Sequence, residues 1–297
     1  MEKKKHKIRF NLVAVIGCVI LAIYCLCLLS PIFWGVLTSL KDIDDFRNNI
    51  LGFPSKEYGL AFSNYPYVLK LFEADAVYNG IYFKANLGDM LYNTLLYVVG
   101  SAFMSTIFPC LMAYVVAKFP FKLSKVIYSI VLITMIVPIV GSYPSEIVML
   151  KNLRLFNTMY GALIQKANFL GMYFLVFHAT FARLSGDYAE AAYLDGANEF
   201  VVMTRIILPL VKNIFFTVFL IKFIEYWNDY QTPHLYFPGY PTIAYGSFYM
   251  SKQYINGLET VPLRMTSCII VVIPILVLFI IFSERLMSNI SMGGLKE

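Results

Sequence analysis

Long apolar runs separated by short polar connections dominate the pattern of this chain. A helix needs about 20 predominantly apolar residues to cross the roughly 30 Å hydrocarbon core of a bilayer. Several runs reach that length, so the pattern predicts an all-α integral membrane protein. We expect six transmembrane helices, at about residues 10–37, 90–117, 126–148, 167–184, 213–232 and 266–284.

Two of the six runs are irregular. Pro138, Gly141 and Pro144 interrupt the third run near its outer end, and proline breaks or kinks a helix interior. The fourth run is short before Arg183 unless it begins in the polar stretch near Gln165. The sequence therefore defines the limits of the third and fourth spans less well than those of the other four.

Basic residues at the N-terminus set the expected orientation. Lys3, Lys4, Lys5, Lys7 and Arg9 precede the first run, as they would in a secretion signal. That run continues to about residue 40, far beyond the 7–15 apolar residues of a signal peptide, so we expect an uncleaved first span. Basic residues beside a first span favour the cytoplasm. Six spans then place both termini inside, and the acidic, aromatic segment 41–89 outside, as a cap over the bundle or against a partner.

Composition agrees with a membrane protein and removes other classes. The chain has 297 residues, of which 59% are hydrophobic and 14% charged, against about a quarter charged in soluble domains. Much of the positive excess lies in the first nine residues, so it is no nucleic-acid footprint. The cysteines lie inside apolar runs, which is typical of small apolar side chains rather than a disulfide framework or metal site: Cys18, Cys25, Cys27, Cys110 and Cys268.

The connection between the fourth and fifth runs has the pattern of two short helices. Asp187–Asp195 contains good helix formers, and Gly196 can take the left-handed conformation that ends a helix. Asn198 is a candidate N-cap for a second helix through about Leu208, and Pro209 marks its end. Apolar residues of the second helix can anchor this hairpin to the bundle: Phe200, Val201, Met203, Ile206, Ile207 and Leu210.

Any connection between two spans can contain an amphipathic helix, so helical character alone does not assign this hairpin a role. Its spacing is more specific: Glu190-Ala191-Ala192, three residues, Gly196, nine residues, Ile206, one residue, Leu208-Pro209. This pattern resembles the EAA loop of permease subunits in binding-protein-dependent ABC importers. The resemblance implies an ATPase-coupling loop at 187–209 that contains Glu190, Ala191, Ala192, Asp195, Gly196, Ile206, Leu208 and Pro209.

Shorter matches extend the resemblance along the chain, toward the carbohydrate-uptake branch and its maltose-type G subunit. They are Pro31, Ser39-Leu40-Lys41, Phe53-Pro54, Asn64-Tyr65, the segment 223–230 with its Trp-Asn pair, and the small-residue tail 292–296. Two stretches depart from the family. Ser185-Gly186 stand where the family usually has Ile-Pro, and Thr242–Gly246 replace its Leu-Pro-x-Gly, so contacts with the binding protein can differ.

The resemblance implies the type I ABC importer permease fold, as a single transmembrane domain over 1–297 with an N-terminal span at 10–37 and core spans within 90–284. It implies a multi-pass subunit of the bacterial plasma membrane that forms the path for a sugar. The implied partners are a second permease subunit in a heterodimer, a cytoplasmic ATPase dimer and an extracytoplasmic solute-binding protein. The sequence has no G-x-x-x-x-G-K-[ST] loop, so ATP and Mg would be bound by the separate ATPase.

Ionisable residues in the fifth run are candidates for the substrate path. Lys222, Glu225 and Asp229 lie along one helical stripe, and charges at membrane depth face a cavity or each other. A structural Lys–Glu pair, with Asp229 near the outer interface, is an equal alternative. If the stripe lines a path, the aromatic and hydrogen-bonding groups that a sugar needs are at hand, and the predicted path is Glu225, Tyr226, Trp227, Asn228 and Asp229.

Catalysis and metal binding have no support in the sequence. His6, His178 and His234 stand apart from Cys, Asp or Glu at ligand spacing, and no nucleophile–base set appears, so we expect no catalytic residue and no cofactor in this chain. An autonomous secondary transporter would favour an internal repeat with matching broken helices, and we find none. A membrane enzyme would need a clustered catalytic set. The importer subunit is the preferred hypothesis over both.

Overall fold

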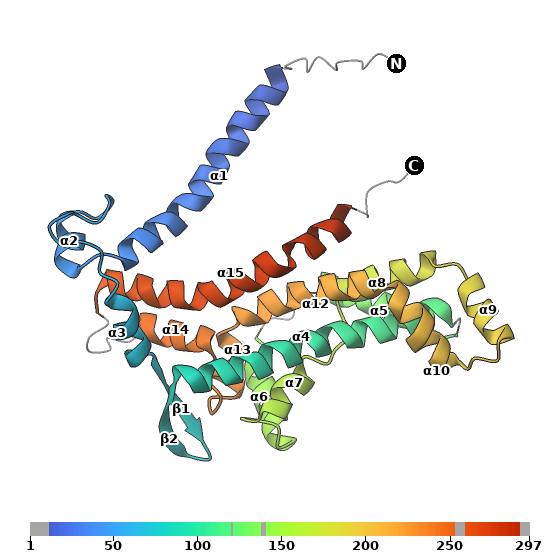
Figure 1. Ribbon diagram of the computed structural model, residues 1–297. Coiled ribbons are helices and arrows are strands. Elements are labelled where there is room, and N and C mark those ends of the chain that lie inside the picture. The colour runs from blue at the N-terminus through green and yellow to red at the C-terminus, as the bar shows by residue number, and fades with distance from the viewer. Residues whose placement is uncertain (1–11, 120, 138–140, 253–258, 292–297) are drawn as a thin grey trace, which may run out of the picture. The chain divides into compact units, whose positions relative to one another are not determined.

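The computed structural model describes residues 12–119, 121–137, 141–252 and 259–291. Helices dominate it, together with one β-hairpin (Figure 1). The chain divides into two compact units, one of residues 1–71 with 253–270 and one of residues 72–252 with 271–297. All the candidate path and coupling residues belong to the second unit.

The first unit contains helices α1 (Leu12–Ser39), α2 (Ile43–Asn48), α3 (Asn64–Leu71) and the beginning of α15 (Val261–Ser291). Its centre is the end of α1. The Asn64 side-chain amide donates to the carbonyls of Ser39 and Lys41, at 2.9 Å each, and Thr266 Oγ1 donates to the Ser39 carbonyl at 3.2 Å. Lys41 is buried and donates to the Asn49 carbonyl. These bonds join the short segments of the unit to the end of α1.

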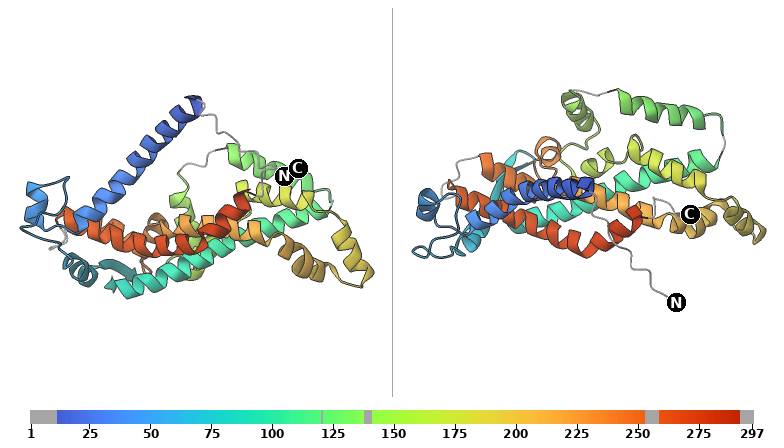
Figure 2. Two further views of the ribbon diagram at one scale, coloured as in Figure 1. Left: turned by 45° about the horizontal axis from the view of Figure 1, so that its top comes forward. Right: turned by 90° about the horizontal axis from the view of Figure 1, so that it is seen from above.

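The second unit is built around helix α4 (Leu87–Lys118), with α8 (Met172–Arg183) and α12 (Lys212–Trp227) alongside it (Figure 1, Figure 2). The antiparallel hairpin of β1 (Glu73–Tyr78) and β2 (Ile81–Asn86) leads into α4. Asn86 and Asp89 form a capping box at that helix start. The remaining elements are α5 (Ser124–Ile136), α6 (Tyr143–Asn152), α7 (Met159–Gln165), α9 (Asp187–Leu194), α10 (Glu199–Val201), η1 (Val202–Ile207), α11 (Leu208–Leu210), α13 (Gln231–Tyr236) and α14 (Ile243–Lys252).

Two clusters of buried side chains hold the second unit together. One cluster joins α4, α8 and the segment 202–218, with Phe174, Phe177 and Phe181 of α8 fully buried in it. The other joins α4 to α6, α7, α12 and α13 around Tyr97, Trp227 and Phe237. Within a bilayer, close van der Waals packing of such aromatic side chains, rather than their transfer from water, stabilises clusters of this kind. The two clusters hold both ends of α12 against α4.

The helical prediction is confirmed, and the span count stays a prediction. Among the described residues, Ala14–Ser39 and Leu87–Lys118 are long and apolar enough to cross a membrane. A third span results if the bent pair Glu199–Leu210 and Lys212–Trp227 counts as one. The fifth run thus contributes a helix that ends at Trp227, and Asn228–Tyr230 form a turn before α13 rather than its continuation.

The third and fourth runs do not form the continuous helices expected over 126–148 and 167–184. Helix α5 ends at Ile136, and α6 begins only at Tyr143, with Gly141 at a φ of 78° between them. Pro138 lies outside the described residues. Helix α8 has 12 residues and begins after Gly171, whose φ is 120°. Positive φ values at glycine end regular helix at the places where the sequence carries its breaking residues.

Candidate functional site

The predicted loop forms a helix–turn–helix at one end of α4, opposite the β-hairpin (Figure 1). Helix α9 ends at Leu194, and Gly196 has a φ of 82°. The Asn198 side chain accepts a hydrogen bond from the Val201 N–H at 2.9 Å, as an N-cap does. The glycine turn and the asparagine cap therefore have the conformations that the sequence predicts. We refer to residues 187–210 as the loop hairpin.

The second arm of the loop hairpin ends later than predicted. Residues 202–207 form a π-helix, in which the Leu208 N–H donates to the Met203 carbonyl. Pro209 lies in the first turn of α11, where its missing N–H costs little. The chain bends at Val211, and the axes of Glu199–Leu210 and Lys212–Trp227 differ by 72°. Pro209 therefore precedes the bend instead of ending the helix.

Fewer residues of the second arm of the loop hairpin pack against the helix bundle than the sequence predicts. Val202 and Ile207 are buried in the cluster with α4 and α8, and Met203 and Ile206 pack against them. Phe200 is 69% exposed and Leu210 is 46% exposed, so the expectation that they anchor the hairpin is wrong. Leu194 in the other arm is 89% exposed. The loop hairpin thus presents large apolar side chains on its free surface.

Polar contacts fix the two arms relative to each other and to α4. The Tyr193 hydroxyl donates to the Glu199 carboxylate at 2.5 Å across the turn. That carboxylate raises the pKa of Tyr193 to about 12, so the hydroxyl stays protonated and donating at neutral pH. Lys118, the last residue of α4, donates to the Leu184 carbonyl at 2.7 Å just before α9. Glu190 is exposed on the surface of α9.

A cavity of about 660 Å³ lies between α6, the end of α7, α12 and α13. Its size is in the range of small-molecule sites, about 300–1,000 Å³. Three of the five predicted path residues line it: Glu225, Tyr226 and Asp229. Trp227 is buried instead and stacks on Phe223 with ring centroids 6.0 Å apart. Asn228 is exposed and donates to the Ile224 carbonyl, so neither Trp227 nor Asn228 lines the cavity.

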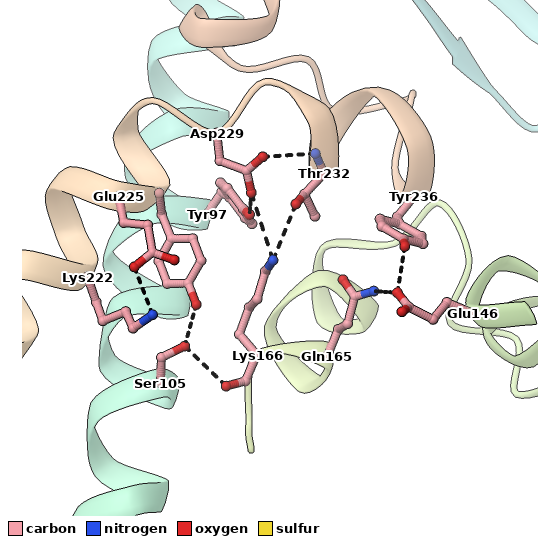
Figure 3. A network of polar contacts seen from close by, with 11 residues as sticks. Tyr97, Ser105, Glu146, Gln165, Lys166, Lys222, Glu225, Asp229, Thr232 and Tyr236 are labelled. Atoms are coloured by element: carbon pink, nitrogen blue, oxygen red, sulfur yellow. Dashed lines mark hydrogen bonds and ion pairs between the residues drawn. The ribbon is translucent and has the colours of Figure 1, made fainter. Parts of the chain in front are cut away.

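One wall of the cavity is a network of charged and polar groups around Asp229 (Figure 3). Asp229 accepts from the Tyr97 hydroxyl at 2.7 Å and from the Thr232 N–H at 2.9 Å. Lys166 Nζ lies 3.8 Å from the carboxylate and donates to Thr232 Oγ1 at 3.3 Å. Lys166 and Asp229 have side-chain exposures of only 19% and 18%, so the pair is held within the protein.

A second polar group on the cavity wall centres on Glu146 of α6 (Figure 3). Its Oε2 accepts from the Tyr236 hydroxyl at 2.5 Å and from Gln165 Nε2 at 3.1 Å. Gln165 Oε1 is buried and has no hydrogen-bond partner. Glu146, Gln165 and Lys166 lie well before the fifth span in the sequence, in or beside the third and fourth runs. The sequence analysis did not assign them to the path, and only their contacts reveal them.

The charge stripe of α12 splits into two parts. Lys222 Nζ and Glu225 Oε2 form the expected pair at 2.8 Å. Lys222 also lies over the ring of Tyr173, 5.0 Å from its centroid, which is cation–π distance. Asp229 has its partners in α4 and the α7–α8 connection instead. The structural pair and a cavity-lining role therefore coexist, because Glu225 serves both.

The histidines that the structure describes contact aromatic rings. His178 stacks on Phe174 at 5.9 Å between centroids, and His234 stacks on Tyr245 at 5.3 Å. Among the described residues, no group of three or more His, Cys, Asp or Glu side chains has the arrangement to hold a metal ion. His6 lies outside the described residues.

Comparison with known proteins identifies the family. Residues 87–291 match the family described as the inner membrane component of binding-protein-dependent transport systems. The chain belongs to this family. Its members are permease subunits of transporters, so the chain is a transport component and not itself an enzyme.

Individual relatives agree along nearly the whole chain. The arabinooligosaccharides transport system permease AraQ of Bacillus subtilis is 23% identical and covers 98% of this chain and 99% of its own. The multiple sugar-binding transport system permease MsmG of Streptococcus mutans is 26% identical, with coverages of 94% and 95%. The trehalose/maltose permease MalG of Thermococcus litoralis is 25% identical, with coverages of 98% and 99%.

A solved structure confirms the fold. A chain of a bacterial ABC transporter involved in the import of the acidic polysaccharide alginate matches with a TM-score of 0.75 at 22% identity. The match covers 95% of this chain and 99% of that chain. The chain therefore has the type I ABC importer permease fold, and it is a component of a cell membrane.

Proposed function

We propose that the chain is one membrane-spanning subunit of an ABC importer and forms part of the translocation path for a sugar or oligosaccharide. The observation that carries this function is the family match over residues 87–291, which includes the EAA-like loop hairpin. The relatives named above transport arabinooligosaccharides, multiple sugars, and trehalose or maltose. The cavity supports the same function, because tyrosine rings and hydrogen-bonding groups suit a sugar.

In this proposal the chain works with three protein partners. A second permease subunit completes a heterodimer, a cytoplasmic ATPase dimer binds ATP and Mg, and an extracytoplasmic solute-binding protein delivers the carbohydrate. The lipid bilayer surrounds six spans, with both termini in the cytoplasm. The family description supports the binding protein and the membrane, and the basic N-terminal residues support the orientation. The tail 292–296, which resembles the family's ending, lies outside the described residues.

The loop hairpin is the proposed ATPase-coupling site. Three features support this role: its EAA-like spacing, its position at the end of α4 opposite the β-hairpin, and its exposed Leu194 and Phe200. Exposed large apolar side chains on a rigid, hydrogen-bonded element are typical of an interaction surface. Glu190 lies exposed on α9, in position to meet a cationic group of the ATPase.

The function is tested by uptake in cells. Deleting this chain should abolish uptake of the importer's sugar. Re-expressing the chain should restore uptake only in cells that also contain the second permease, the ATPase and the binding protein. The readout is accumulation of radiolabelled sugars from a panel of mono- and oligosaccharides. Normal accumulation of every sugar in the deletion strain, with loss of a non-carbohydrate solute instead, would refute the proposal.

The coupling role has its own test in Glu190→Ala. Truncating one partner of a buried interface charge pair typically costs about 2–5 kcal/mol, so the ATPase should dissociate more readily and uptake should fall, while membrane insertion is unchanged. Copurification of the ATPase with the permease pair measures the first effect. Asp187→Ala, an exposed carboxylate one turn earlier in α9, is the control. Equal ATPase recovery and equal uptake in both variants would exclude Glu190 from the coupling contact.

A further inference from the structure

The charged side chains of the cavity wall do not all have an oppositely charged partner in contact with them. Among the ionisable side chains that line it, Glu146, Glu225 and Asp229 are acidic and Lys166 is basic. Lys166 lies beside Asp229, and Lys222 neutralises Glu225 from just outside the lining. Glu146 has neutral hydrogen-bond donors in Tyr236, Gln165 and Ser142, and Lys166 acts on its charge without forming an ion-pair contact with it. The described wall therefore carries one carboxylate without an ion pair.

Lysine side chains that would attract an acidic sugar are already engaged. Lys166 Nζ contacts Asp229 and Thr232 and lies 5.1 Å from the centroid of the Tyr226 ring. Lys222 is paired with Glu225 and lies over the Tyr173 ring. A sugar carboxylate entering the cavity would thus have to displace an existing pair to find a cation, and Glu146 would repel it.

The acceptor oxygens of the same wall favour a ligand that donates hydrogen bonds. Gln165 Oε1 is buried without a hydrogen-bond partner and is covered by the protein, so Glu146 is the acceptor of this pair that a ligand can reach. The Glu146 carboxylate accepts from two donors at Oε2 and, as a carboxylate, has further acceptor capacity. Hydroxyl and amino groups of a sugar can donate to the Glu146 carboxylate, whereas a sugar carboxylate cannot.

We propose that this cavity selects non-acidic sugars, neutral or amino-bearing, and that Glu146 is the residue that discriminates against acidic ones. The inference rests on the proposed import function and narrows its substrate class. Glu146 acts here through its charge, and Gln165 holds it in place by donating to its Oε2. The cavity then differs in preference from the alginate importer, although the two chains share a fold.

The test measures occupancy of the cavity in the complete importer in lipid nanodiscs. All five native cysteines are replaced by alanine, and Leu153, which lines the cavity and is 59% exposed, is changed to cysteine. The labelling rate of Leu153→Cys with a small polar thiol reagent is followed without sugar, with a neutral glucose trisaccharide, with triglucosamine and with trigalacturonate. Leu132→Cys on α5, which is exposed and outside the cavity lining, is the control for effects unrelated to the cavity.

We expect the glucose trisaccharide and triglucosamine to protect Leu153→Cys at concentrations at least about tenfold lower than the concentration at which trigalacturonate protects it. Tenfold is the order of magnitude for two like charges about 10 Å apart at an effective dielectric constant of about 20. Glu146→Gln keeps the side-chain shape and should remove most of that difference. Glu57→Gln, an exposed carboxylate of the first unit, should leave it unchanged.

Three results would overturn the inference: equal protection by trigalacturonate, no protection by any of the three sugars, or an undiminished difference in Glu146→Gln. In each case uptake of the importer's own sugar by the same cysteine variant is measured in parallel. Normal sugar uptake would leave the import function standing while the inference falls. If no sugar is taken up by cells with the intact importer, the function itself fails.

Discussion

At the scale of single residues, backbone conformation defines the loop hairpin. Gly196 has a φ of 82°, and no atom lies within 4 Å of the position that a Cβ would occupy there. A side chain at this position would meet no steric obstacle from neighbours, so the cost of replacing the glycine is a backbone cost. Gly186, at the start of α9, has a φ of −65° and no such restriction. The two glycines therefore form a matched pair for testing the turn.

Gly196→Ala should reduce uptake and weaken ATPase binding, because a non-glycine residue in the left-handed region costs about 1–2 kcal/mol. The chain can relieve that cost by opening the turn, which separates α9 from α10. Gly186→Ala should leave both properties near the wild-type level. Parallel uptake assays and ATPase copurification measure the difference. Indistinguishable variants would mean that the turn geometry has no part in coupling.

Residue-scale signals also explain what the sequence could and could not predict. The conformations of Gly196 and Asn198 depend on neighbours within a few positions, so their residue types predict them. Trp227 and Asn228 do not line the cavity with Glu225 and Asp229. Trp227 is two residues from Glu225 and so lies on another face of the helix, and Asn228 is the cap at which α12 ends. Glu146 and Gln165 meet Tyr236 across 90 and 71 residues, and no local pattern encodes such pairs.

At the scale of elements, the short helices matter through the side chains they position. Thr158 caps the start of helix α7, its Oγ1 accepting from the Gly161 N–H at 3.0 Å. The helix ends at Gln165 beside the cavity. A Cβ on Gly161 would lie 2.0 Å from the Leu155 carbonyl oxygen. The first turn of α7 is thus packed directly on backbone, and the placement of Gln165 and Lys166 depends on that contact.

Gly161→Ala should destabilise α7 by about 1–3 kcal/mol or more, the usual cost of overpacking, and lower sugar uptake by displacing Gln165 and Lys166. Gly17→Ala in α1, where no atom lies within 4 Å of the new Cβ, should be tolerated. Thermal unfolding of the detergent-purified complex and uptake in cells give the two measurements. A Gly161→Ala protein with unchanged stability and uptake would contradict the close packing.

The residues at the end of α1 and the start of α3 that resemble the family are hydrogen-bonded to each other. Asn64 bridges the carbonyls of Ser39 and Lys41, and Ser39 Oγ lies 2.9 Å from the Tyr65 hydroxyl. Ser39-Leu40-Lys41 and Asn64-Tyr65 were two separate points of family resemblance in the sequence. Their hydrogen bonds give both a structural reason within the first unit, which sequence spacing alone does not predict.

Asn64→Ala should cost about 1–3 kcal/mol of stability, because the Lys41 carbonyl loses this donor and the Ser39 carbonyl is left with Thr266 Oγ1. Asn48→Ala, at an exposed position of α2, should change stability by less than about 0.5 kcal/mol. Limited proteolysis between residues 40 and 64 provides the measurement, with faster cleavage expected only for Asn64→Ala. Equal cleavage rates in the two variants would show that the bridge does not hold this segment.

At the scale of the whole molecule, the cavity and the loop hairpin are two sites of one transport component. The large clusters that hold α12 against α4 follow from apolar composition, which the sequence displays. The division of the third and fourth runs into short helices follows from glycine and proline positions, whose consequences depend on packing.

Cysteines at Glu225 and Asp229 should react with small polar thiol reagents in the cysteine-free importer, because both positions line the cavity. A cysteine at Trp227 should be protected, since that side chain is 3% exposed and packed on Phe223. Labelling rates with and without ATP report how access changes during the cycle. Protection of all three positions in every state would indicate that the cavity is closed to the path.

Helix α12 begins directly after the bend at Val211. With 16 residues it is about 24 Å long, with the loop hairpin at one end and the turn that holds Asp229 just beyond the other. A rigid rod that pivots by about 10° near Val211 moves its far end by about 4 Å, given that length. That displacement exceeds the reach of the Tyr97–Asp229 hydrogen bond. A pivot of that size at Val211 would therefore separate Asp229 from Tyr97 on α4, and the cavity wall would lose this hydrogen bond.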